Sequence, residues 1–401
     1  MSGDLLHVLS TVEGYIYPNE VTTLWTVVIA MYPYITGLVA GAFIVASLER
    51  VFKWKELFPT YKLSLLTALS FMLVATTPLL LHLGNPFRGP YIFFTPHLTS
   101  AMAAFGFVYL WYLMAVLCLE IWYDYRAKFV RWSKEETFFI KRWVYKALTL
   151  FNDDLSEEAI EGDEKTGYII TIIGLPSAVL LHGYVGFIFG SIKANPWWAS
   201  PMMPIIFLFS AIVSGVGLLI VIYNLVSWVK KIPIDQVAMD KLGNFLLYVT
   251  LMDLTLEAME LIHMFYASEE SIDMVRVLIG DKLFFSLIEV QVIFGTLVPI
   301  IILSITRAGF IKEFAHRRMI YLASGLLVMI GVFAMRWNVV IGGQLFSKSL
   351  YGFKIYDMTW LGKEGAGMAI ALFILPFLIL SVLLYFLPPW DDMVPGAEKG
   401  E

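Results

Sequence analysis

Four titratable side chains recur along one face of an apolar stretch in the second half of the chain, namely Asp253, Glu257, Glu260 and His263. At 100° per residue of an α-helix, the three carboxyl groups fall within about 60° of arc, and the imidazole lies about 60° further round. Carboxyl and imidazole groups placed in this way can pass protons along a helix that crosses a membrane. The sequence therefore predicts a proton relay made of these four residues and Glu289 of the next apolar stretch.

Arg336, followed by Asn338, is the charge partner that the sequence offers to these acids. An ionisable side chain near the bilayer centre costs about 2.5 to 3.5 kcal/mol, so each one needs a partner or a function. Three carboxylates on one face would repel each other, so at least one of them binds a proton near neutrality or pairs with Arg336. The alternative is a buried ion-pair lattice that pins helices together, centred on Arg336 with Glu289 or Glu260. The excess of acids over cations favours the relay.

Composition defines the class of protein that must hold these groups. Of the 401 residues, 59% are apolar and only 15% are charged, whereas soluble globular proteins carry about 25% charged residues. The single cysteine, Cys118, excludes an internal disulfide and a cysteine-ligated iron–sulfur cluster, and it is not part of a covalent haem motif. The small net charge of -5 gives no indication of nucleic-acid binding.

Nine stretches are long and apolar enough to cross a bilayer as helices, which need about 20 residues each. Their limits are 24–48, 63–83, 99–123, 168–193, 204–229, 242–265, 283–306, 319–339 and 364–387. The sequence therefore predicts an all-α integral membrane protein of about nine transmembrane helices, arranged in four-helix-bundle units.

The distribution of Lys and Arg predicts the orientation of these helices. The segments 49–62, 124–167, 230–241, 307–318 and 388–401 hold 20 of the 28 basic residues, and the loops on the other side hold 7. The basic side is expected in the cytoplasm, so the N-terminus lies outside and the C-terminus inside the plasma membrane of a prokaryote. The predicted parts are an exoplasmic segment 1–23, helices 1–5 in 24–229 with a cytoplasmic insertion at 124–167, helices 6–9 with the relay in 230–387, and a cytoplasmic tail 388–401.

The positions of the histidines indicate whether the chain could bind a b-type haem. A b-type haem needs two axial histidines from facing helices at one depth. His82 and His97 flank the loop after the second stretch, and His182 lies deeper in the fourth stretch, where no second histidine shares its level. A bis-His haem b anchor therefore stays an alternative. A proton-coupled secondary transporter is another, although such proteins use paired broken helices in corresponding halves, which the sequence does not indicate.

Several segments resemble a known family. They are GLVAGAF at 37–43, HLGNPFR at 82–88, HLTS at 97–100, HGYVG at 182–186 and NPWWASPMMP at 195–204. Their order and placement are similar to those of the polysulfide reductase NrfD family, the quinone-interacting membrane anchors of iron–sulfur oxidoreductases. The string AMRWNVVIGGQ at 334–344 is similar to the longer branch, which includes the membrane subunits of hydrogenase-2 and of the Dsr complex.

The resemblance implies a membrane anchor subunit of a respiratory oxidoreductase of anaerobic or sulfur metabolism, with no complete active site of its own. It implies menaquinone or ubiquinone bound near the outer face in the first helical bundle, with no haem or iron–sulfur cluster in this chain. Tyr184 matches the family's quinone-contacting tyrosine, and His182 and His97 match histidines of the family. His82 stands where the family usually has Asp, and it is a further candidate for quinone binding.

The expected partners are a peripheral ferredoxin-like iron–sulfur subunit on the outer face, further catalytic or cytochrome subunits and the lipid bilayer. A passive anchor for a peripheral enzyme is the alternative to a quinone-binding subunit. It predicts that changing Tyr184, His182 or Glu260 leaves quinone-linked activity intact.

Overall fold

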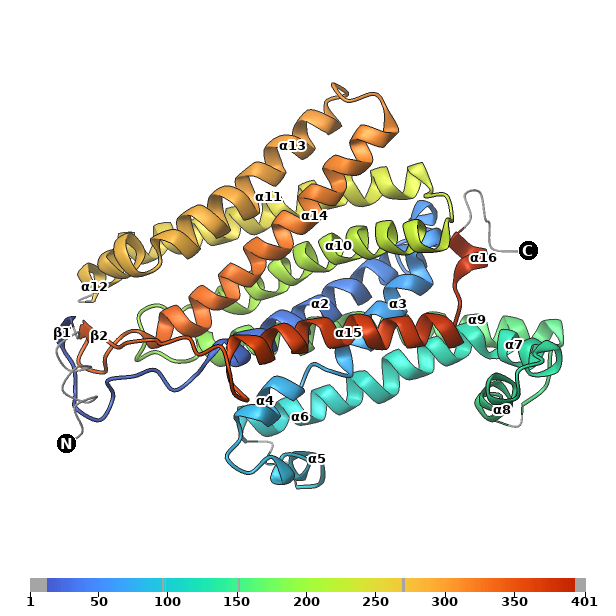
Figure 1. Cartoon of the computed structure of the whole chain (residues 1–401), viewed down its shortest axis with the longest axis horizontal. Coiled ribbons are helices and arrows are strands. Elements are labelled where there is room, and N and C mark those ends of the chain that lie inside the picture. Colours follow the sequence, from blue (N-terminus) through green and yellow to red (C-terminus); the bar gives the residue numbers. More distant parts are fainter. Residues whose placement is uncertain (1–12, 96, 98, 151, 269–270, 394–401) are drawn as a thin grey trace.

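The chain forms an elongated bundle of long helices that lie side by side. The computed structural model describes residues 13–95, 97, 99–150, 152–268 and 271–393. Strand β1 (Glu13–Tyr15) lies at one end of the bundle, and the short helix α16 (Trp390–Met393) lies at the other (Figure 1). Residues 1–12 and 394–401 of the two predicted terminal segments lie outside the described residues.

The first half of the chain makes five passages along the bundle. They are α2 (Val27–Arg50); α3 (Phe58–Met72) continued by α4 (Thr77–His82); α6 (Ala101–Trp111) continued by η3 (Tyr112–Cys118) and α7 (Leu119–Glu135); α9 (Glu157–Gly190); and α10 (Met203–Lys230). The connections contain η1 (Lys55–Leu57), η2 (Pro86–Arg88), α5 (Tyr91–Phe94) and α8 (Phe139–Leu148). Each of the five predicted stretches overlaps one of these passages. α9 begins at Glu157, well inside the predicted insertion 124–167.

The second half makes four further passages. They are α11 (Gln236–Ala267); α12 (Ile272–Val277), η4 (Leu278–Lys282), η5 (Phe284–Leu297) and α13 (Val298–Arg307) in series; α14 (Phe314–Trp337) continued by η6 (Asn338–Gly342); and α15 (Ala366–Phe386). The strand β2 (Tyr351–Phe353) lies in the last connection and pairs antiparallel with β1. These passages again overlap the predicted stretches.

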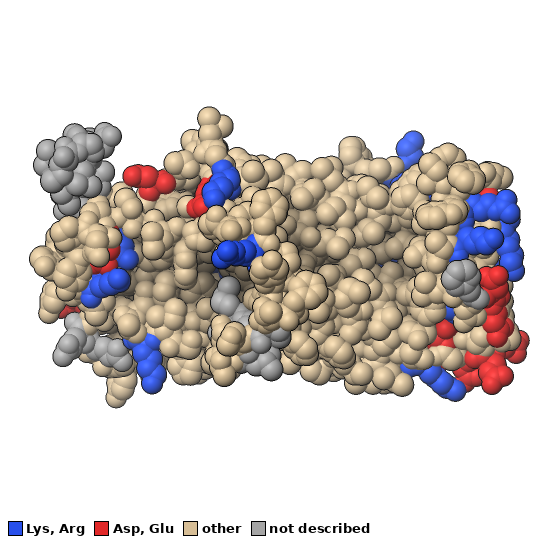
Figure 2. Space-filling view, turned by 90° about the horizontal axis from the view of Figure 1, so that it is seen from below, with Lys and Arg blue, Asp and Glu red and all other residues tan. Residues whose placement is uncertain are grey.

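The surface and the lengths of the helices fit a bilayer. Among the described residues, eight helices are long and apolar enough to span a membrane. The predicted stretch that is not among these eight is 242–265, which lies in α11, a helix of 32 residues. α11 carries Asp253, Glu257, Glu260 and His263, here called the acidic stripe, and it runs beside α10, α13 and α14 (Figure 1). In the face shown in Figure 2, charged side chains gather towards the two ends of the molecule, and the middle is largely free of them. The chain is therefore an all-α integral membrane protein of eight or nine spans, which confirms the predicted fold class.

We call the end where α2 ends at Arg50 and α10 ends at Lys230 the basic face, and the end that carries β1 and β2 the opposite face. At the basic face the insertion 124–167 is largely helical, since α7 and α9 extend into it and α8 lies between them. Arg126 ties the insertion together, because its Nε donates to Asp163 at 2.5 Å and its Nη1 donates to the carbonyl of Asp154 at 2.6 Å.

Among the described residues, four segments of these passages are π-helical, namely η3, η4, η5 and η6. In η5 the hydroxyl of Thr296 donates to the carbonyl of Gln291, five residues earlier, which matches the wider π-helical turn. π-Helical turns change which side chains share a helix face, and they occur frequently at functional sites. Both η5 and η6 carry polar residues of the candidate site described below.

Glycines allow the central helices to approach closely. A Cβ at Gly41 of α2 would collide with the backbone of Ala211 and Gly215 on α10, and a Cβ at Gly331 of α14 would collide with Gly295 of η5. Small residues at such contacts let membrane helices pack backbone to backbone. The small-residue segment 37–43 therefore places α2 against α10, at the centre of the bundle.

At the opposite face, hydrogen bonds of Glu20 link the segment before α2 to the connection between η6 and α15. Its carboxylate accepts hydrogen bonds from the Ser347 hydroxyl at 2.6 Å and from the Lys348 backbone N–H at 3.1 Å. Partial burial acts to raise the pKa of Glu20, but these hydrogen bonds outweigh it and hold the pKa below its usual value. The resulting stabilisation is present at neutral pH and is lost as the pH falls through the lowered pKa.

Candidate functional site

Arg336 and His182 form a buried pair where α9, α10 and α14 meet. Arg336 is fully buried, and its Nη2 lies 3.0 Å from His182 Nε2 and 2.7 Å from the Ser210 hydroxyl. Because a guanidinium only donates, His182 Nε2 is the acceptor and its proton lies on Nδ1, 3.5 Å from the hydroxyl of Thr36 on α2. The guanidinium also stacks 4.0 Å above the ring of Phe207. This Arg336–His182 pair joins four helices.

Three tyrosines of α2, α6 and α9 form a second group. The hydroxyls of Tyr184 on α9 and Tyr109 on α6 lie close enough to that of Tyr32 on α2 to interact with it electrostatically. Tyr184 is half-buried, whereas its neighbours Leu180 and Phe187 are 61% and 53% exposed on the lipid-facing surface of α9. The tyrosine cluster, Tyr32, Tyr109 and Tyr184, is thus a polar site next to an apolar surface that lipid can reach.

A hydrogen-bonded chain of an acid and amides connects α11, η5 and η6. The Gln291 amide donates to Glu257 at 3.0 Å, and the Asn338 amide donates to the Gln291 carbonyl oxygen at 2.8 Å. The Ser286 hydroxyl then donates to the Asn338 carbonyl oxygen at 2.6 Å. Trp197, in the connection before α10, donates to the backbone carbonyl of Asn338 at 2.9 Å. We call Glu257, Gln291, Asn338 and Ser286 the acid–amide chain.

The predicted acidic stripe borders two small cavities. Asp253 is buried, and within the described residues its Oδ1 has no hydrogen-bond partner, although it interacts electrostatically with Glu257. A cavity of about 70 Å³ is lined by Glu257 and Glu260, and a second of about 50 Å³ by Glu260 and His263. Both cavities also share Met264. The structure thus places the stripe on one side of α11, from a buried acid to the exposed His263 at the opposite face.

Other predicted residues lie apart from these groups. His82 pairs with Glu364 at 3.3 Å, and His97 is exposed in the loop before α6. Glu289 lies on η5 but is not part of the acid–amide chain. The alternative pairing of Arg336 with Glu289 or Glu260 is wrong, because the described side-chain partners of Arg336 are His182, Ser210 and Met335.

Sequence reasoning missed Gln291, Ser286, Ser210 and Thr36. All four are neutral polar residues, which are common enough in membrane helices that type alone does not single them out. The position of Gln291 within an apolar run could have identified it as a site residue, because a buried amide has several hydrogen-bonding atoms that need partners. Its π-helical setting could not be inferred from the 3.6-residue period.

Comparisons with known proteins relate the chain to membrane subunits of reductases. The family model described as polysulphide reductase, NrfD, matches residues 18–348. The C subunit of selenate reductase from Mesobacillus selenatarsenatis is 27% identical over 369 residues, which cover 87% of this chain and 84% of the relative. A protein of Halobacterium salinarum, provisionally named as the C membrane subunit of dimethyl sulfoxide reductase, is 27% identical over 55% of this chain and 48% of its own length. The chain belongs to the polysulphide reductase NrfD family of membrane subunits.

Proposed function

We propose that this chain, as the membrane subunit of a reductase complex, binds quinone or quinol at the tyrosine cluster near the opposite face. It exchanges electrons with an iron–sulfur partner subunit docked there, and it moves protons through the acidic stripe of α11. Family membership and the names of its relatives support the reductase complex.

The observation that carries the proposal is the position of Tyr184. It interacts electrostatically with Tyr32 of α2, while Leu180 and Phe187 on the same helix are exposed on the apolar surface. The Tyr184 hydroxyl itself is buried, about one helix turn from these exposed side chains. A ring that enters from the bilayer beside Leu180 and Phe187 therefore meets a phenolic O–H after a local shift of side chains, and phenolic O–H groups donate hydrogen bonds to carbonyl oxygens. Menaquinone and ubiquinone both carry such carbonyls, and when bound they supply transfer of two electrons and two protons.

The Arg336–His182 pair lies directly behind this site. Thr36 and Tyr32 are one turn apart on α2, and the Thr36 hydroxyl, which faces His182, also donates to the Tyr32 carbonyl at 2.9 Å. The pair thus ties together α2 and α9, the helices that carry Tyr32 and Tyr184. In this arrangement both ring nitrogens of His182 are engaged, by Arg336 and Thr36, which favours the quinone proposal over a haem b anchor.

Proton transfer is assigned to Asp253, Glu257, Glu260 and His263. Carboxyl groups can accept and release protons, whereas the amide of Gln291, which itself accepts from Asn338, orients Glu257 by a hydrogen bond. The cavities beside Glu260 and His263 lead towards the opposite face. With the basic face in the cytoplasm of a prokaryote, as the distribution of Lys and Arg favours, these protons exchange with the outside.

A ferredoxin-like iron–sulfur subunit is the proposed electron partner. The chain has one cysteine, so a cysteine-ligated cluster must come from another subunit. The relatives, each named as the C subunit of a reductase, support the presence of further subunits, catalytic or cytochrome. His82, the last residue of α4, and His97, in the loop before α6, lie on the side of the opposite face, where such a partner would dock.

Replacing Tyr184 with Phe tests the quinone site. We expect quinol-linked activity of the assembled complex to fall about tenfold, because removing one hydrogen bond of about 1.4 kcal/mol has that effect. Activity with a soluble artificial electron donor should stay unchanged. Tyr266→Phe is the matched control, since Tyr266 is 90% exposed at the end of α11. Equal quinol-linked rates and apparent quinol affinity in wild type and Tyr184→Phe would instead support a passive anchor.

A further inference from the structure

A second buried acid, Glu120, lies at the basic face, remote from the stripe of α11. Glu120 is fully buried on α7, and its Oε1 accepts from the Thr171 hydroxyl of α9 at 2.6 Å and from the Tyr61 hydroxyl of α3 at 3.0 Å. Its other oxygen, Oε2, is buried and has no hydrogen-bond partner among the described residues. A buried carboxyl with one oxygen unpaired is costly as an anion.

The charges around Glu120 do not balance if it is ionised. Asp124, one turn later on α7, forms an ion pair with Arg50 at 2.5 Å, whereas Glu120 lies 3.9 Å from the same guanidinium. Tyr61 bridges the two acids, since its oxygen lies 2.7 Å from Asp124 and also contacts Arg50. One cation thus faces two carboxyl groups, and the second carboxyl is most stable with a proton. Tyr112 also interacts electrostatically with Glu120, and its hydroxyl is buried.

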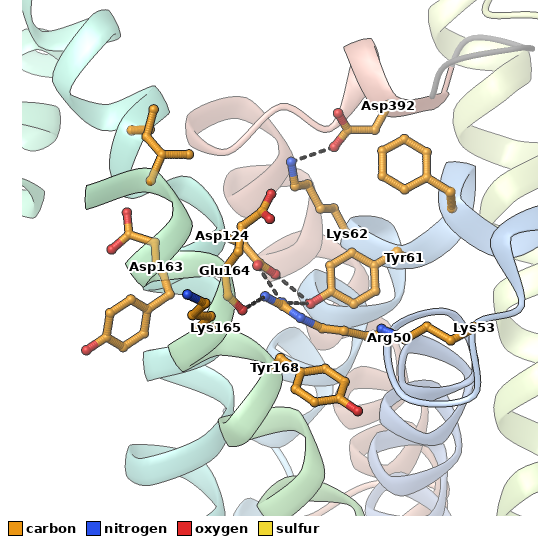
Figure 3. A pocket seen from close by; sticks show the side chains of 14 residues that line it. Arg50, Lys53, Tyr61, Lys62, Asp124, Asp163, Glu164, Lys165, Tyr168 and Asp392 are labelled. Carbon is orange, nitrogen blue, oxygen red and sulfur yellow. Dashed lines mark hydrogen bonds and ion pairs between the residues drawn. The ribbon is translucent and has the colours of Figure 1, made fainter. Parts of the chain in front are cut away.

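The cluster opens to water on one side. A cavity of about 440 Å³ at the basic face is lined by Arg50, Tyr61 and Asp124, with Lys53 and Lys62 at its edge (Figure 3). In Figure 3 the side chains of Arg50, Asp124 and Tyr61 converge on one point. Glu120 is not among the lining residues, so Tyr61 and Asp124 lie between it and the cavity.

We propose that Glu120 is a proton-loading site that is filled from the basic face through Asp124 and Tyr61. A hydronium ion in the cavity protonates Asp124 and leaves water. The Tyr61 O–H then gives its proton to the Glu120 carboxylate and takes the proton from Asp124, so that Tyr61 and Asp124 end unchanged and Glu120 holds one proton. This site goes beyond the proposed function, because none of its residues belongs to the tyrosine cluster or to the stripe of α11.

Infrared difference spectroscopy of the assembled complex in membranes tests the proposal without using quinone. We expect a protonated-carboxyl band near neutral pH that shifts in heavy water and is lost in Glu120→Gln, which keeps the shape of the side chain. In Tyr61→Phe the band should remain, but its exchange into heavy water should slow by about a hundredfold, the lower end of what a positioned proton-transfer group contributes.

A carbodiimide, which reacts with protonated carboxyl groups, gives a second readout on the wild-type protein. Mass spectrometry of the labelled chain should find the adduct at Glu120. The proposal is overturned if Glu120→Gln loses no carboxyl band and Glu120 takes no label, because Glu120 is then an ionised partner of Arg50. The route is overturned if Tyr61→Phe exchanges as fast as wild type. Since neither readout depends on quinone, these outcomes are independent of the test on Tyr184.

Discussion

Replacing Arg336 with Leu is expected to destabilise the protein by about 3 to 5 kcal/mol, the cost of removing one member of a buried charged group. The guanidinium is fully buried, donates to Ser210 and His182, and attracts Asp253 and Glu257. Without it, both acids lose the nearby positive charge, and His182 loses its donor. Thermal unfolding in detergent, compared with wild type, measures the effect.

Two further variants separate the charge of Arg336 from its shape. Arg336→Lys keeps a cation but loses the fork of donors, so it should be intermediate in stability. Adding Asp253→Asn to Arg336→Leu removes one uncompensated acid and should restore part of the lost stability. If Arg336→Leu unfolds at the wild-type temperature, Arg336 is not the charge that stabilises the junction of α9, α10 and α14.

Replacing Glu257 with Gln is expected to lower quinol-linked turnover by about a hundredfold, as loss of a proton-transfer group does, while stability changes little. Glutamine preserves the size of the side chain and can still accept a hydrogen bond from Gln291, but it cannot carry a proton. Turnover of the assembled complex with quinol, measured beside its turnover with a soluble donor, gives the comparison.

Glu289→Gln is the matched control for Glu257. Glu289 is half-buried on η5 and lies outside the acid–amide chain, so we expect turnover close to wild type. The reverse order, with Glu289→Gln inactive and Glu257→Gln active, would show that the relay runs along η5 rather than α11.

The spans of this protein could be predicted because bilayer crossing imposes a strong local constraint. Each of the nine predicted apolar stretches overlaps one helical passage. The ends of the helices are harder to predict. For example, α9 begins at Glu157, in the acidic part of the insertion 124–167, for which the sequence predicts a cytoplasmic helix and loop with a solvated charged face. Helices that project beyond the bilayer carry no hydropathy signal, so only the apolar part of α9 could be found.

The partners of the buried charges could not be predicted in the same way. Residue types alone offer Glu289 and Glu260 as ion-pair partners of Arg336, because opposite charges attract. In the structure it meets His182, Ser210 and the ring of Phe207, all brought to it by helices distant in sequence. The direction of a buried side chain depends on how neighbouring helices pack, and close contacts such as Gly41 against α10 decide this.

Photoaffinity labelling with a quinone that carries a photoreactive group on its ring tests the central claim most directly. After illumination of the assembled complex, peptide mapping should place the label on α9 around Tyr184 and on α2 around Tyr32, and excess native quinone should abolish it. A competed label confined to the cavities between α11 and η5, with none on α2 or α9, would contradict a quinone site at the tyrosine cluster.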